Sequence, residues 1–145
     1  MDLGADLVVS PRDLEDALAC AGVKEVDCIL NFVDTDAYWD VMARLIRPLG
    51  SICSIVRPQQ PKDLGLFFQK AVSFSWELMF TKSSFQTPDM ESQHHILSRV
   101  AQLVDEGRVK SPVTTVLRGF SVENLKKAHL QLESHQTIGK VVVAF

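Results

Sequence analysis

A glycine-rich loop is absent from this sequence. The seven glycines are spread singly over 145 residues, and none belongs to a GxGxxG pattern. Such a loop brings the backbone close to a dinucleotide pyrophosphate, whose charge is stabilised by the amino terminus of the following helix. A complete nucleotide-binding α/β domain usually carries this loop early, after its first strand. The glycines of this sequence therefore provide no grip on a pyrophosphate.

Cysteine is also scarce. Cys20, Cys28 and Cys53 are widely spaced among apolar neighbours and form no CxxC pair. We expect them to be buried free thiols in a reducing cytoplasm. His94 and His95 fall on a predicted helix, where adjacent side chains point about 100° apart and are unsuited to chelating one metal ion. The sequence thus predicts no zinc site and a cytoplasmic location.

Long apolar runs and an excess of one charge are missing as well. No run approaches the ~18 residues of a membrane span, and no charged segment leads into an apolar one as in a secretory signal. The 15 Lys and Arg residues stand against 18 Asp and Glu residues, which gives a net charge of −3. We therefore expect neither a membrane nor a nucleic-acid partner. A GxSxG nucleophile pattern is also absent, so we set hydrolysis aside.

The sequence does contain an alternation of strand and helix patterns. Short apolar runs predict strands at 7–9, 26–33, 51–56, 71–80 and 140–145, with a weaker candidate at 111–117. Apolar residues at helical spacing predict helices at 11–21, 35–47, 89–106 and after Ser121. The run at 26–33 is too apolar for a strand with one wet face, and it is typical of a parallel strand covered by helices on both faces. Its apolar residues are Val26, Cys28, Ile29, Leu30 and Phe32. The alternation predicts an α/β fold with a mainly parallel sheet.

Residues with capping preferences mark the expected helix ends. The four expected caps are Ser10, Asp34 or Thr35, Thr87 and Ser121. Pro11 and Pro88 stand at first helical positions, and the stretch Pro48–Gly50 is expected to end the second helix. In that helix the expected buried stripe is Tyr38, Val41, Met42, Leu45 and Ile46. The stretch 63–70 is either a short helix or irregular, and the pattern does not separate the two.

Ligands of parallel sheets bind beyond the carboxyl ends of the strands. This rule singles out three loops in the sequence, at 31–36, 57–62 and 81–87. The rule alone names no ligand.

Several segments together carry a family resemblance. The stretches "VDCILNFVDTD", "WELMFTKSSFQTPDM" and "LKKAHLQLESHQTIGKVVV" follow one another in a fixed order. They closely resemble the carboxyl-terminal part of zinc-type alcohol dehydrogenase-like proteins, in the quinone-oxidoreductase branch of the medium-chain dehydrogenase/reductase superfamily. The resemblance implies a partial Rossmann fold that lacks the first two strands and the glycine-rich loop. Residues 7–9 would be its third strand, and the next three predicted strands would be its fourth to sixth.

The resemblance also implies a domain arrangement and a function. Residues 1–145 would form one domain, with the carboxyl-terminal half of the NAD(P)-binding Rossmann domain at about 1–90 and a returning segment at about 91–145. The chain would be the middle and end of a longer enzyme that transfers hydride from NADPH to a quinone or an activated alkene. We expect no catalytic residue within it and little or no activity of the chain alone.

The same resemblance assigns residues to the cofactor. Asn31, Val33 and Asp34 would approach the nicotinamide ribose, although Asp34 and Thr35 also suit a helix cap. Phe80 and Thr81 would meet the nicotinamide carboxamide, or belong only to a loop at a dimer edge. His135 stands where relatives carry an arginine that reaches a cofactor phosphate, and its contact would weaken at neutral pH because an unperturbed histidine has a pKa of about 6.5.

A second interpretation needs no catalysis. In the family that the sequence resembles, the sixth strand pairs with its equivalent in a second copy. The strand at Ala71–Phe80 alternates apolar and polar residues, and an edge strand with unpaired backbone groups invites such pairing. The chain would then be a non-enzymatic dimerisation module and a homodimer.

Overall fold

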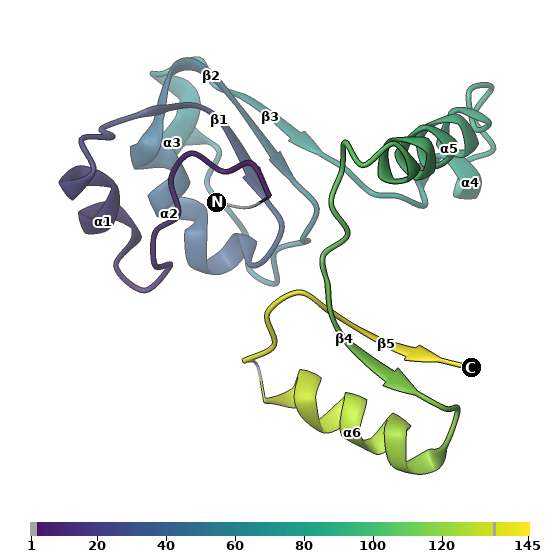
Figure 1. Cartoon of the computed structure of the whole chain (residues 1–145). Helices are drawn as coiled ribbons and strands as arrows, with labels where there is room; N and C mark the ends of the chain where they lie inside the picture. Colours follow the sequence, from purple (N-terminus) through teal and green to yellow (C-terminus); the bar gives the residue numbers. More distant parts are fainter. Residues whose placement is uncertain (1–2, 135) are drawn as a thin grey trace. The chain divides into compact units, whose positions relative to one another are not determined.

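The computed structural model describes residues 3–134 and 136–145, which fall into two compact units that meet at Met90 and Glu91. The first unit contains α1 (Leu14–Cys20), β1 (Val26–Asn31), α2 (Thr35–Leu45), β2 (Ile46–Ser54), α3 (Gly65–Phe68), β3 (Ser73–Trp76) and α4 (Thr81–Ser84). The second contains α5 (Ser92–Asp105), β4 (Val113–Arg118), α6 (Val122–Glu133) and β5 (Lys140–Ala144) (Figure 1).

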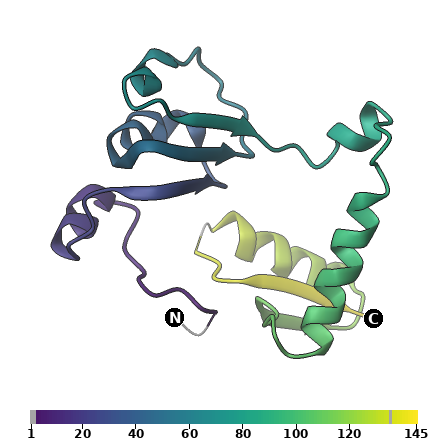
Figure 2. The same cartoon turned by 90° about the horizontal axis from the view of Figure 1, so that it is seen from above.

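The first unit is built on a three-stranded parallel sheet in the order β1-β2-β3. Ile29 lies opposite Ile52 in this sheet, and Ile52 lies opposite Phe74. The second unit holds a two-stranded parallel sheet, β4-β5, whose crossover is α6. Figure 2 shows the arrows of the three-stranded sheet running in the same direction, and Figure 1 shows the same for β4 and β5. The predicted α/β class with parallel sheets is therefore confirmed.

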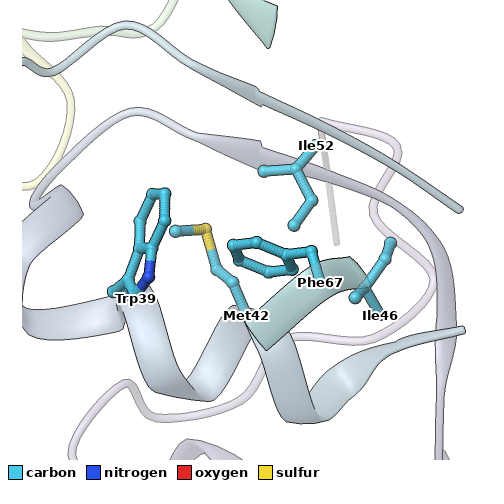
Figure 3. Close-up of a cluster of buried hydrophobic side chains, with 5 residues drawn as sticks. All are labelled: Trp39, Met42, Ile46, Ile52 and Phe67. Carbon is cyan, nitrogen blue, oxygen red and sulfur yellow. The ribbon is translucent and has the colours of Figure 1, made fainter. Parts of the chain in front are cut away.

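A small aromatic and aliphatic core holds the first unit together. Trp39 and Met42 of α2 pack with Ile46 and Ile52 of β2 and with Phe67 of α3 (Figure 3). Ile46 and Ile52 are almost fully buried. The centre of this contact is Trp39, whose ring meets that of Phe67 edge-on with centroids 5.1 Å apart. Contacts of this geometry add to the free energy gained by removing apolar area from water.

The expected strand at 7–9 is wrong. Residues 7–9 are irregular, and Leu7 and Val8 are exposed. In a doubly wound sheet of order 3-2-1-4-5-6, the third strand pairs with the second, and the second and first strands separate it from the fourth. Among the described residues this sheet holds only β1, β2 and β3. Residues 7–9 therefore have no second strand with which to form backbone hydrogen bonds. The following helix also begins later than expected, at Leu14, because the Ser10 hydroxyl accepts from the Arg12 N–H in a turn instead of capping it.

Pro48 and Gly50 lie inside β2 and do not end the helix before it. The helix α2 ends at Leu45, and β2 begins at once with Ile46. The pairing then jumps from Val26–Ile46 to Cys28–Ser51, so the residues between bulge out of the ladder. A proline is tolerated in such a bulge because its missing N–H breaks no ladder hydrogen bond.

Lys70, three residues before β3, bonds both the bulge and the end of α2. Its ammonium donates to the carbonyls of Ala43, Arg44 and Ile46 at 3.0, 2.9 and 2.6 Å, at the carboxyl end of α2. The Lys70 carbonyl in turn accepts from the Leu49 N–H at 2.7 Å. A cation at this end of a helix satisfies carbonyls that have no partner within the helix and interacts favourably with the helix dipole.

Lys70→Met should therefore lower the free energy of unfolding of the first unit by about 1–2 kcal/mol, because three carbonyls lose a charged donor. Methionine keeps the length of the side chain. Lys24→Met is the matched control, because Lys24 is exposed, and it should change stability by less than about 0.5 kcal/mol. Urea unfolding followed by circular dichroism measures both, and equal midpoints would contradict the capping role.

Other expectations for the first unit need correction. Only Ser73–Trp76 of the predicted 71–80 strand is a strand, and the loop expected at 81–87 contains α4. Of the two alternatives for the stretch 63–70, the structure has the short helix, α3. Cys20 and Cys28 are free but exposed, and Cys53 is half-buried. Leu30 is 60% exposed, so helices do not cover both faces of β1.

The second unit follows its sequence pattern more closely. The Ser121 hydroxyl accepts from the Asn124 N–H at 3.2 Å and caps α6, as predicted. The predicted strands at 111–117 and 140–145 correspond to β4 and β5. Thr87 does not cap α5, because its hydroxyl donates to the Asp89 carboxylate at 2.7 Å, and the helix begins at Ser92. No helix in residues 3–134 and 136–145 has the length and hydropathy that a bilayer span requires.

Candidate functional site

Three buried polar side chains meet where β1 and β2 end. Asn31 is the last residue of β1, Thr35 the first of α2 and Ser54 the last of β2, and all three are more than nine-tenths buried. The Asn31 Nδ2 lies 2.9 Å from Thr35 Oγ1 and 3.1 Å from Ser54 Oγ. The two hydroxyl oxygens are 2.7 Å apart. We call these three residues the Asn31 cluster.

The hydrogen bonds of the cluster fix the orientation of the Asn31 amide. Its Oδ1 accepts from the Val33 N–H at 3.4 Å, so the opposite orientation would set two donors against each other. Both Nδ2 hydrogens are then used by the two hydroxyl oxygens. The Thr35 hydroxyl donates to the Val56 carbonyl at 2.5 Å, and the Ser54 oxygen accepts from the Val56 N–H at 3.4 Å. The Asn31 amide nitrogen therefore has no hydrogen left for a ligand.

Val33 and Asp34 follow Asn31 on the exposed side of the same turn. Val33 is 76% exposed. The Asp34 carboxylate accepts from the Ala37 N–H at 2.9 Å and is the side-chain cap of α2. The structure thus brings Asn31, Val33 and Asp34 together at the carboxyl end of β1. Of the two residues that the sequence offered as the cap of α2, Asp34 is the one that serves.

The loop after β2 is held by Asp36 in the first turn of α2. Its carboxylate accepts from the Gln59 and Gln60 N–H groups at 2.6 and 3.3 Å and pairs with the Lys62 ammonium at 2.7 Å. The pair with Lys62 and the Gln59 N–H hold the pKa of Asp36 below its ordinary value of 3.8. This carboxylate joins two of the three loops that the sequence pattern singles out.

The lowered pKa of Asp36 predicts a loss of order in acid. A carboxyl group with a depressed folded pKa contributes its stabilisation above its unfolded pKa and loses it as the pH falls through the folded pKa. Hydrogen exchange of residues 57–62 should therefore be slow at neutral pH and become faster in acid than the change in intrinsic rate explains. Asp36→Asn should show fast exchange already at neutral pH. Asp16→Asn, an exposed control in α1, should leave these residues unchanged.

Phe80 and Thr81 lie at the start of α4. Thr81 N–H donates to the Leu78 carbonyl at 3.0 Å, and the Phe80 carbonyl accepts from the Ser84 N–H at 2.8 Å. Phe80 is 61% exposed. These hydrogen bonds stay within the turn and link neither residue to the Asn31 cluster. His135 lies outside the described residues.

An open apolar groove of about 420 Å³ lies beside β1, between α1 and α2. Leu14 and Leu18 of α1, Leu30 of β1 and Val41 of α2 contribute to its lining. The link between the two helices is a pair of hydrogen bonds from the Arg44 guanidinium to the Glu15 carboxylate, both 2.7 Å long. The groove extends to Phe32 and Val33, so the exposed turn after β1 has an apolar side.

The described part of the chain does not supply a metal site. Within residues 3–134 and 136–145, no three His, Cys, Asp or Glu side chains lie where they could hold one ion together. The absence of zinc from the working protein stays a prediction.

The fold defines an α/β protein with parallel sheets, and comparisons with known proteins place it within a family. The family model described as zinc-binding dehydrogenase matches residues 3–143. The chain therefore belongs to the zinc-binding dehydrogenase family. It is 35% identical, over 144 residues, to a zinc-type alcohol dehydrogenase-like protein of Staphylococcus epidermidis, and the match covers 99% of this chain and 43% of that protein.

Solved structures agree with this assignment. A protein of Rhizobium etli, solved as a candidate zinc-dependent alcohol dehydrogenase, is 39% identical with a TM-score of 0.84, and the match covers 99% of this chain and 42% of that one. Escherichia coli quinone oxidoreductase, solved in complex with NADPH, has a TM-score of 0.73 at 19% identity, with 98% of this chain and 44% of that one covered. The second likeness shows the fold alone. The predicted resemblance to the carboxyl-terminal part of such proteins is confirmed.

Sequence reasoning missed Ser54 and the role of Thr35 beside Asn31. Thr35 was expected as a possible cap, and it is instead buried with its hydroxyl in the cluster. One signal was available: Ser54 interrupts the apolar residues of the predicted strand "SICSIV". A polar residue at the carboxyl end of a parallel strand points to the edge where ligands bind.

Proposed function

We propose that this chain forms the nicotinamide-facing part of an NAD(P)H-dependent oxidoreductase that reduces a quinone or an activated alkene by hydride transfer. The observation that carries the proposal is the turn after β1, which is rigidly held by the Asn31 cluster at the carboxyl edge of a parallel sheet. Membership of the zinc-binding dehydrogenase family supports it. The chain spans less than half the length of the relatives above, so the whole enzyme's substrate belongs to this proposal.

The residues at this edge suit the nicotinamide half of the cofactor. Exposed Val33, beside Phe32, offers an apolar surface to a flat ring, and the backbone of Val33 and Asp34 lies next to it. Asn31 supports this turn and does not bind the cofactor through its amide nitrogen, because both Nδ2 hydrogens are donated to Thr35 and Ser54. The cofactor, when bound, supplies the hydride, and these residues orient it and exclude water.

Residues elsewhere complete the proposed contacts. Phe80 and Thr81 would meet the carboxamide, and His135 would approach a cofactor phosphate. No catalytic residue is assigned to this chain, and the sequence has no glycine-rich loop for the pyrophosphate. We therefore expect weak NADPH binding and little or no turnover by the chain alone. The proposed setting is the cytoplasm, where exposed thiols such as Cys20 and Cys28 stay reduced.

Val33→Asp should weaken the binding of reduced nicotinamide ligands about tenfold or more, because it sets a negative charge and its hydration shell against an apolar contact. Val8→Asp makes the same change at another exposed valine and should have little effect. Titration with NADPH and with reduced nicotinamide mononucleotide, followed by the fluorescence of Trp76 at the end of β3, measures both. No binding of either ligand by calorimetry, or normal NADPH oxidation by the chain alone, would contradict the proposal.

A second function rests on β3. Among the described residues this strand has a neighbour on one side only, β2, and Trp76 at its end is 52% exposed. We propose that the segment Ala71–Phe80 pairs with the same segment of a second copy, so that the chain acts as a homodimer or as a purely structural assembly module. Sedimentation tests this function: a monomer at high concentration would contradict it, whatever the cofactor titration gives.

A further inference from the structure

The Asn31 cluster connects two loops that belong to different strands. On one side, Asn31 Oδ1 accepts from the N–H of Val33 in the turn after β1. On the other side, the Thr35 and Ser54 hydroxyls bond the carbonyl and the N–H of Val56 in the loop after β2. The Asn31 carbonyl also accepts from the Ile55 N–H at 3.2 Å. The backbone of both loops therefore depends on the same three side chains.

The cluster has no spare partner. Each hydroxyl oxygen accepts one hydrogen from the Asn31 amide. The Thr35 hydroxyl donates its own hydrogen to the Val56 carbonyl, so the Ser54 hydroxyl is the donor in the 2.7 Å contact between the two oxygens. Ser54 and Thr35 are 0% and 1% exposed, so water does not reach them to replace a lost partner. Deleting one hydroxyl leaves a buried Asn31 hydrogen without an acceptor, which favours a shift of the whole amide. Loss of the Ser54 hydroxyl on β2 therefore changes the structure of the turn after β1.

We propose that Thr35 and Ser54 are positioning residues, which act through Asn31 to hold the turn at 31–36 and the loop at 54–57 as one ligand-facing unit. This inference rests on the proposed function and concerns its nicotinamide mononucleotide half. Neither hydroxyl touches the ligand, because both are buried. The proposed contact is made by the backbone of Val33 and Asp34. Their effect is on the geometry of Val33 and Asp34, which carry the proposed contact.

Three variants test the inference in the full chain. Thr35→Val removes the hydroxyl and keeps the shape of the side chain, Ser54→Ala removes the second hydroxyl, and Thr35→Ser keeps the hydroxyl as the matched control. Hydrogen–deuterium exchange reports on residues 31–36 and 54–57 separately. Titration with reduced nicotinamide mononucleotide gives the affinity. Measurements are made at a temperature at which circular dichroism shows every variant folded.

We expect Thr35→Val and Ser54→Ala to speed exchange in both loops and to raise the dissociation constant for reduced nicotinamide mononucleotide about tenfold. Thr35→Ser should stay within about threefold of the parent chain. Faster exchange confined to the loop of the altered residue would overturn the inference, and so would unchanged affinity with both loops loosened. If the parent chain binds no reduced nicotinamide mononucleotide, the proposed function fails and the positioning role fails with it. The exchange data then still decide whether the cluster couples the loops.

Discussion

Replacing Trp39 by alanine should lower the free energy of unfolding of the first unit by about 3–5 kcal/mol. The indole is 4% exposed and its ring centroid lies 5.1 Å from that of Phe67 and 5.3 Å from that of Phe74. Its Nε1–H also donates to the Asp63 carbonyl at 3.2 Å. The core has few members, so the surrounding side chains cannot collapse far enough to fill the cavity.

Two variants separate the causes of this loss. Trp39→Phe keeps an aromatic ring in the core and gives up the hydrogen bond to Asp63, and it should cost about 1–2 kcal/mol. Trp76→Ala makes the same change as Trp39→Ala at a half-exposed tryptophan that touches only the edge of the core, with its centroid 4.9 Å from that of Phe74. It should cost less than about 2 kcal/mol. Urea unfolding by circular dichroism measures all three, and equal losses at the two tryptophans would refute a core centred on Trp39.

Gly139→Ala should cost the second unit about 2–5 kcal/mol. Gly139 has a φ of +80°, which costs a residue with a Cβ about 1–2 kcal/mol. A Cβ there would also collide with the Pro112 carbonyl oxygen and lie 2.5 Å from Thr114 Cγ2. The strand cannot move away easily, because Lys140 N–H donates to the same carbonyl at 2.8 Å and Thr114 Oγ1 donates to the Ile138 carbonyl at 2.6 Å. The collision adds about 1–3 kcal/mol to the backbone cost.

Gly107 provides the matched control for this substitution. Its φ is +69°, and nothing lies within 4 Å of the place a Cβ would take. Gly107→Ala should therefore cost about 1 kcal/mol, which is the backbone cost alone. Hydrogen exchange of the β4 and β5 amides should become fast in Gly139→Ala and stay slow in Gly107→Ala. If the two variants are equally stable, the contact with Pro112 does not constrain the strand.

The sequence pattern predicts the local structure correctly where it depends on residues within a single element. Ser121 and Asp34 are predicted caps because a side-chain oxygen three residues before a free N–H acts locally, and the structure has both bonds. The pattern fails where the structure of a segment depends on its pairing with a segment elsewhere in the chain. The apolar run at 7–9 lacks a neighbouring strand among the described residues, and the helix that should stop at Pro48–Gly50 stops earlier because Ile46 already pairs with Val26.

The helix α2 shows a subtler limit of the same kind. Met42 and Ile46 of the predicted stripe are buried in the core, and Trp39, which the prediction left out, packs beside them. The other three residues of the stripe line the groove beside β1: Tyr38, Val41 and Leu45. Two apolar sides on one helix give a single broad stripe in the sequence, and periodicity cannot divide it. The candidate site has the same difficulty. Its loops follow from strand order, whereas a contact between Thr35 and Ser54, 19 positions apart, requires the folded register.

The division of the chain at Met90 and Glu91 sets the order in which the protein can take shape during synthesis. All three strands of the first sheet precede that division, and the core on which they pack is complete by Phe74. The ribosome adds about 5–20 residues each second, whereas helices and small sheets form far faster than that. The first unit can therefore mature while β4, α6 and β5 are still being translated, and a late fault such as one at Gly139 would leave it intact.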